Sequence, residues 1–183
     1  MTKRVLTFMA GLALVMSTTA FADSGERKDL QVFNDISKTV NRYAYFSIFD
    51  DVDAAVKDGV VTLTGKVTMP YKRDEIAKRV AKIDGVSEVR NRIGVLPVSQ
   101  FDDELRYRIA RSIYGNSNFW NYATMVNPPI HVVVEHGRVT LTGVVNSDVD
   151  RMLARSLATQ FGAFSVTNNL KTDAEMREAL EKS

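Results

Sequence analysis

The chain has 183 residues, with 24 basic and 22 acidic side chains and a formal net charge of +2. Such a balance supplies no general attraction for a polyanion, so no nucleic-acid partner is predicted. Cysteine is absent, which excludes disulfides, a thiol nucleophile and the acylated cysteine of a lipoprotein.

Residues 1–22 have the pattern of a secretory signal peptide. Lys3 and Arg4 form the positive region, and an apolar stretch and a small-residue cleavage site follow. The apolar stretch is too short to span ~30 Å of hydrocarbon, so we predict cleavage after Ala22 and not a membrane anchor. The mature chain would start at Asp23, lie in the periplasm without a lipid anchor, and carry 22 of the 24 basic residues against 22 acidic ones.

A glycine-valine-leucine pattern occurs twice. The segment 58–67 (DGVVTLTGKV) returns at 136–145 (HGRVTLTGVV), and the spacing of alanine, glycine, valine and asparagine repeats downstream. A repeat of this length indicates two copies of one small module. The predicted organisation after the signal peptide is an N-terminal segment at 23–33, a first module at 34–97, a second at 101–172 and a helical tail at 173–183.

Helical spacing of apolar residues predicts a helix from Asn34 onward in the first copy. Strand-like alternation follows on both sides of an Asp58-Gly59 hairpin turn. The turn sets a register with Val56 opposite Val61 and Ala54 opposite Leu63.

A second helix is predicted after Pro70, ending at Gly85, and a third strand follows it. Its inward residues would be Ile76, Ala77, Val80, Ala81 and Ile83, and those of the strand Val86, Val89, Ile93 and Val95. We place the loss of one residue between the copies in the Pro70 loop, which aligns Ala77 and Ala81 with Ala154 and Ala158.

The second copy repeats each step. A helix with Leu105, Ile109 and Ile113 inward is followed by a hairpin turned by His136-Gly137, where Glu135 and Arg138 are placed to form an ion pair. The second helix would start at Ser147 and end at Gly162, with Val149, Leu153, Leu157 and Phe161 inward. A capping box at Thr172 predicts the short terminal helix.

These elements predict an α+β fold of two tandem modules, each helix-strand-strand-helix-strand, with two helices on one face of a three-stranded mixed sheet. The link at 96–100 is too short for independent tumbling. Gly65 and Gly143 are interpreted as points where a helix crosses close to the strand. Eight residues are assigned to the structural motif: Gly59, Gly65, Gly85, Asn91, Gly137, Gly143, Gly162 and Asn168.

The ordered pattern resembles the BON domain, named for bacterial osmotically inducible and nodulation proteins. It comprises Gly59-x-Val61-x-Leu63-x-Gly65-x-Val67, the downstream residues from Ala77 to Ile93, and their counterparts in copy two. The resemblance implies an envelope protein without catalytic residues or a cofactor; members are linked to osmotic stress, phospholipid binding and assistance to secreted proteins. Copy two departs from the pattern at Ala163 and has about nine extra residues before its first strand.

Neither histidine is assigned to a metal site. His131 and His136 are an odd number of positions apart along a strand, so their side chains should point to opposite faces. The carboxylates of Asp50, Asp51 and Asp53 are interpreted as a solvated strand end, and a hydrolase built on them is the least favoured function.

Two asparagines are expected to have a structural role. Asn91 and Asn168 fall on the apolar side of the third strands. We expect each amide to hydrogen-bond a backbone turn and not a ligand.

Residues 114–129, here called the aromatic segment, contain the only tryptophan beside tyrosines, a phenylalanine and a methionine. Amphipathic rings suit a membrane interface or a peptide-binding surface. Phe119, Trp120, Tyr122 and Met125 are therefore candidate lipid- or partner-binding residues; the alternative is a flap that extends the core of copy two.

Two functions stay open. The first is a non-enzymatic periplasmic envelope or stress protein that binds membrane phospholipid or another envelope component. The alternative is a soluble periplasmic chaperone that shields exported client proteins. The sequence predicts no oligomeric state.

Overall fold

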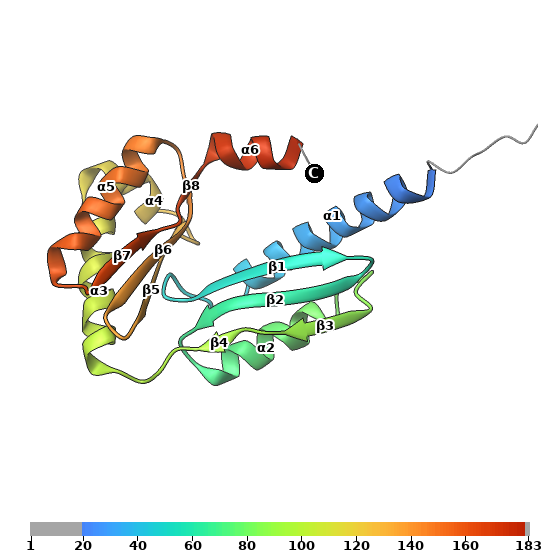
Figure 1. Ribbon diagram of the computed structural model, residues 1–183, viewed down its shortest axis with the longest axis horizontal. Coiled ribbons are helices and arrows are strands. Elements are labelled where there is room, and N and C mark those ends of the chain that lie inside the picture. Colours follow the sequence, from blue (N-terminus) through green and yellow to red (C-terminus); the bar gives the residue numbers. More distant parts are fainter. Residues whose placement is uncertain (1–19, 182–183) are drawn as a thin grey trace, which may run out of the picture.

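The computed structural model describes residues 20–181, which form two α+β modules and a terminal helix (Figure 1). The predicted signal peptide lies almost entirely outside the described residues. The predicted cleavage site at Ala22 falls in the first turn of the first helix.

Module one is a mixed sheet with two helices on one face. Its sheet has the order β1-β2-β3, in which β1 is antiparallel to β2, while β3 and β4 both pair with β2 in parallel. The elements are α1 (Ala20–Asn41), β1 (Asp51–Lys57), β2 (Val60–Val67), α2 (Pro70–Val80), β3 (Glu88–Asn91) and β4 (Gly94–Val95).

Module two repeats this topology with the order β5-β6-β7 and with β8 paired to β6. Two additions, η1 and α4, precede its first strand. The elements are α3 (Gln100–Tyr114), η1 (Ser117–Phe119), α4 (Trp120–Ala123), β5 (Ile130–Glu135), β6 (Arg138–Val145), α5 (Asp148–Ala158), η2 (Thr159–Phe161), β7 (Ser165–Asn168), β8 (Lys171–Thr172) and the terminal α6 (Asp173–Glu181).

The hairpin registers are confirmed. Val56 lies opposite Val61 and Ala54 opposite Leu63, and the second hairpin has the same register. Asp58 and His136 both have φ of 52° and the glycines after them 75° and 72°, the left-handed pair that a two-residue hairpin turn requires. The side chains of Leu63 and Leu141 are fully buried.

A carboxylate closes each hairpin turn. Asp29 of α1 accepts hydrogen bonds from the backbone N–H groups of Asp58 and Gly59 at 2.8 and 3.1 Å. Asp102 of α3 does the same for His136 and Gly137 at 2.8 and 2.7 Å. The predicted start of the first helix at Asn34 is wrong. Helix α1 begins at Ala20 and therefore already contains Asp29.

Gly65 and Gly143 are required for a different reason from the predicted one. Both have φ of 111°. A Cβ atom would lie 2.2 Å from the carbonyl oxygen of Asp51 at Gly65, and 1.8 Å from that of Pro129 at Gly143. The close neighbour is therefore the backbone at the start of the paired strand and not a helix.

The one-residue difference between the modules falls after the second helix and not in the Pro70 loop. The buried Ile76 and Val80 of α2 occupy the places of Ala154 and Ala158 in α5. Ala81 is consequently exposed, and Val149, predicted to point inward, is 71% exposed. Helix α2 ends at Val80, before Gly85, whereas Gly162, with a left-handed φ of 75°, ends the α5–η2 helix as predicted.

Each predicted third strand is divided into two short strands by an asparagine. The Asn91 amide donates to the carbonyl of Arg73 at 3.1 Å, and its oxygen accepts from the backbone N–H of Ile93 at 3.2 Å. Asn168 makes the same two bonds, to Arg151 at 2.9 Å and from Leu170 at 3.3 Å. The predicted structural role is confirmed, but each amide donates to a carbonyl of the second helix and not to a turn, and Asn91 itself is exposed and not buried.

The two modules have separate hydrophobic cores. Leu96 of the link is buried and Gln100 already belongs to α3, whose first turn is capped by the Ser99 hydroxyl. In the tail, Thr172 and Glu175 form the predicted capping box, with reciprocal bonds of 2.8 and 3.2 Å.

Candidate interaction surface

The aromatic segment is anchored at both ends of its helical part. At its start, the Tyr114 hydroxyl donates to the carbonyl of Ile130 at 2.6 Å and accepts from the N–H of the same residue at 3.0 Å. Phe119 is fully buried in the core of module two, and Tyr122 is buried beside it. Their burial corrects the expectation that these two residues line a binding surface; they extend the core.

Between and after these anchors, three apolar side chains face solvent. Trp120 is 69% exposed, Met125 48% and Val126 97%. Of the four candidate binding residues, Trp120 and Met125 are therefore accessible, and Val126 adds to them. We call Trp120, Met125 and Val126 the exposed triad.

Tyr122 ties the aromatic segment to the second helix of its module. Its hydroxyl donates to the Asp150 carboxylate at 2.9 Å and accepts from the backbone N–H of Asn146 at 2.7 Å. Burial raises the pKa of this tyrosine, so the hydroxyl stays protonated. Trp120 thus lies on the same short helix as this anchored side chain, and Met125 and Val126 follow that helix.

Within the aspartate cluster at the start of β1, Asp50 is not solvated, which corrects the prediction for this residue, whereas Asp51 is half-buried and Asp53 is exposed. Its side chain is fully buried and forms an ion pair with Lys72 of α2, Oδ2 to Nζ at 2.6 Å. It also accepts bonds from Thr68 and Ser47. Burial alone would raise the pKa of Asp50, but the bonds from Lys72, Thr68 and Ser47 hold it below the ordinary value. These contacts use the carboxylate structurally and leave it no free oxygen for hydrolysis.

The two histidines have different structural roles. His131 Nδ1 lies 2.6 Å from the carbonyl oxygen of Asp50, and its ring contacts Phe46. Because a carbonyl can only accept, that ring nitrogen carries a proton. His136 forms the hairpin turn. Across residues 20–181, no group of three or more histidine and carboxylate side chains is placed to hold a metal ion.

The connection between α1 and β1 joins the two modules. The carbonyl of Ile48 accepts the N–H of Val132 on β5 at 2.7 Å, and the ring of Phe49 contacts that of Tyr107 on α3. Glu135 pairs with Lys66 of module one at 3.0 Å and not with Arg138, its predicted partner. These contacts fix the relative orientation of the modules, as the short link predicts.

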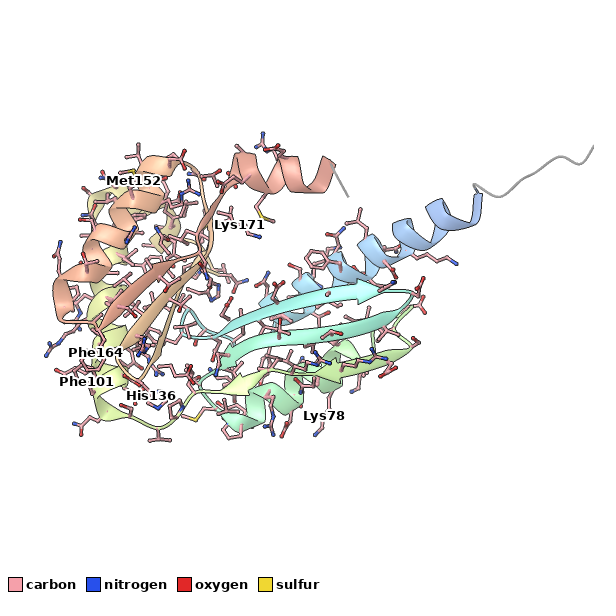
Figure 2. All side chains as sticks on the ribbon, viewed as in Figure 1. Lys78, Phe101, His136, Met152, Phe164 and Lys171 are labelled. Carbon is pink, nitrogen blue, oxygen red and sulfur yellow. The ribbon has the colours of Figure 1, made fainter. Side chains whose placement is uncertain are left out.

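Two further exposed aromatic pairs were not predicted. Phe101 and Phe164 stack at the hairpin turn of module two, where His136 also lies (Figure 2). On module one, the exposed Tyr45 and Tyr71 meet edge to face, with ring centroids 5.9 Å apart. The two members of each pair are distant in sequence, so no local pattern indicates that the rings meet.

Among residues 20–181, no helix combines the length and the apolar character that crossing a bilayer would need.

Comparison with known families identifies the family to which the chain belongs. The BON domain matches residues 34–97 and 121–174, so this protein belongs to the BON-domain family and carries two copies of the domain. The family is generally non-enzymatic and is linked to phospholipid binding and envelope stress.

A search of curated proteins found no match. Among solved structures, the chain is similar to CdsD of Chlamydia trachomatis, described as a structural protein of the type III secretion system: 17% identity, 84% of this chain, 68% of that one and a TM-score of 0.31. A structure of the C-terminal domain of CdsD gives 15% identity, 78% of this chain, 65% of that one and a TM-score of 0.32.

Proposed function

We propose that this protein binds the surface of a phospholipid membrane through the exposed triad of module two, without catalysing a reaction. The observation that carries the proposal is the presentation of Trp120. Its ring is mostly exposed while Phe119 before it and Tyr122 after it are buried. An indole ring held at the protein surface suits the boundary between headgroups and acyl chains, where one part of the ring is apolar and the N–H is wet.

The hydrogen bonds that hold the aromatic segment favour this use of the side chains. Binding through a flexible loop would cost conformational entropy when the loop becomes ordered. Here the segment is already ordered by the two bonds of the Tyr122 hydroxyl and by the Tyr114 contacts with Ile130. The near-neutral charge of the predicted mature chain suggests that apolar insertion, more than charge, provides the affinity. A periplasmic location is inferred from the predicted signal peptide.

Co-sedimentation with vesicles tests this function. The mature protein is mixed with vesicles of phosphatidylethanolamine and phosphatidylglycerol, and the bound fraction is compared for the wild type, Trp120→Ala and Val126→Ser. Met152→Ala is the matched control, since Met152 is an exposed apolar residue on the outer face of α5 (Figure 2). Loss of binding in the two triad variants alone supports the proposal; equal binding by all four proteins contradicts it.

A second candidate, a chaperone that shields exported client proteins, is favoured by a separate observation. Module one also exposes apolar side chains, with Tyr45 and Tyr71 in contact and Met69 half exposed. Apolar surfaces on both modules suit contact with an extended client. Suppression of client aggregation that depends on Tyr71 but not on Trp120 would favour this function over membrane binding.

A further inference from the structure

A groove runs between helix α1 and strand β1 of module one. Figure 1 shows α1 lying along β1, and the hollow between them has a volume of about 270 Å³. Phe33, Ile36 and Val40 of the helix line one wall, and Val52 and Ala54 of the strand line the other. His131, Gly143 and Val144 of module two also line the hollow, where the second module lies against the first. The walls are therefore largely apolar, with a strand backbone on one side.

Strand β1 is an edge of its sheet, since within the described residues it pairs only with β2. The N–H of Ala54 bonds to the carboxylate of its own neighbour, Asp53, at 2.8 Å. Asp53 is exposed, so water can replace its carboxylate at little cost. This backbone donor is thus available to an incoming carbonyl.

The equivalent donor in module two already binds a carbonyl from outside its sheet. Ala54 pairs with Leu63 in the first hairpin, and Val132 pairs with Leu141 at the same position of the second. The N–H of Val132 is held by the carbonyl of Ile48 from module one at 2.7 Å. The repeat therefore presents one outward N–H twice, once bound to a carbonyl of the other module and once bound only to the exposed carboxylate of Asp53.

Charge indicates what would fit the open position. Asp51 and Asp53 lie at the start of β1. Within the described residues neither carboxylate forms an ion pair, since Lys66, the cross-strand partner of Asp51, pairs with Glu135 instead. A partner with cationic side chains beside apolar ones would complement both the strand and the groove. Only a polypeptide backbone supplies carbonyl groups at the spacing of a strand, which a lipid chain lacks.

We propose that module one binds an extended, cationic and apolar peptide segment by strand addition to β1, within the α1–β1 groove. The backbone of the peptide pairs with the free edge at Ala54, alternate apolar side chains enter the groove, and basic side chains face Asp51 and Asp53. This site is distinct from the exposed triad and goes beyond membrane binding.

The test uses the full mature chain and a fluorescein-labelled heptapeptide of alternating valine and lysine. Fluorescence anisotropy should show saturable binding, and N-methylation of the central peptide residue should abolish it. Asp53→Lys should weaken binding about tenfold. Asp84→Lys, at an exposed aspartate outside the groove, and Trp120→Ala should leave it unchanged, which separates this result from the fate of the membrane proposal.

Amide hydrogen exchange locates the peptide without mutation. Addition of the peptide should slow exchange across β1, with Ala54 at its centre. No binding, equal binding by the Asp53→Lys variant, or protection elsewhere would overturn the proposal. If β1 becomes protected without peptide when the protein concentration is raised, a second copy of the chain covers the edge. That result would also contradict the proposal.

Discussion

Asp50 and Tyr122 perform the same task in the two modules with different chemistry. The Asp50 carboxylate accepts the N–H of Thr68 at 2.7 Å, and the Tyr122 hydroxyl accepts the N–H of Asn146, also at 2.7 Å. Each side chain also contacts the third residue of the second helix, Lys72 in one module and Asp150 in the other. A buried ion pair in module one is thus replaced by a tyrosine–carboxylate bond in module two.

Removing one partner of the buried ion pair should destabilise the protein. Lys72→Met leaves the Asp50 carboxylate buried without its cation, and we expect a loss of ~3–5 kcal/mol in the free energy of unfolding. Urea denaturation measures the loss. The double variant with Asp50→Asn should recover part of it, because no charge is then left unpaired; additive losses would contradict the coupling.

The same carboxylate predicts a dependence on acid. The folded-state pKa of Asp50 is held below its ordinary value, so its stabilisation is present above the unfolded pKa of about 3.9 and is lost as the pH falls through the folded value. Unfolding free energies of the wild type and Asp50→Asn should therefore converge below about pH 4. A constant difference between them down to pH 2 would be inconsistent with this assignment.

Tyr122→Phe tests the counterpart in module two. The variant keeps the ring in the core but removes the acceptor for Asn146 and the donor to Asp150, which should cost ~1–3 kcal/mol. Thermal or urea unfolding measures the cost. A variant as stable as the wild type would mean that the hydroxyl does not anchor the aromatic segment.

Gly65→Ala and Gly143→Ala should each lower the free energy of unfolding by about 3 kcal/mol, because the residue has a positive φ and the added Cβ collides with the backbone of the paired strand. Gly162→Ala is the matched control. It shares the positive φ, but no atom lies within 4 Å of the added Cβ, so it should cost only ~1–2 kcal/mol. Equal losses of stability at the three positions would contradict the prediction, because they would show that the backbone moves to relieve the collision.

Much of the fold follows from local pattern. Alternation and the turns at Asp58-Gly59 and His136-Gly137 determine both hairpins, because a shift of one residue would expose Leu63 or Leu141. The alignment of the two second helices is harder to predict, since small alanines fit either alignment. The burial of Ile76 and the exposure of Val149 decide between the alignments.

Leu63→Ala and Leu141→Ala should each lower the free energy of unfolding by ~2–5 kcal/mol, whereas Val149→Ala should change the denaturation midpoint little.

The candidate site was less predictable because its decisive contacts are not local. Nothing near Asp50 in the sequence indicates the partner Lys72, so the local sequence favours a solvated cluster although the structure has a buried ion pair. The aromatic segment was recognised from its composition, but composition cannot separate Phe119, whose ring enters the core, from Trp120, whose ring does not. That separation depends on how α4 packs on the module.

The most direct test of membrane binding is the fluorescence of Trp120, the only tryptophan in the chain. In the free protein the exposed ring should emit at long wavelength and be quenched readily by acrylamide. Vesicles of phosphatidylethanolamine and phosphatidylglycerol should shift the emission to shorter wavelength and protect the ring from the quencher. Emission and quenching that stay unchanged at saturating lipid would contradict the proposal that this protein contacts membranes through the exposed triad.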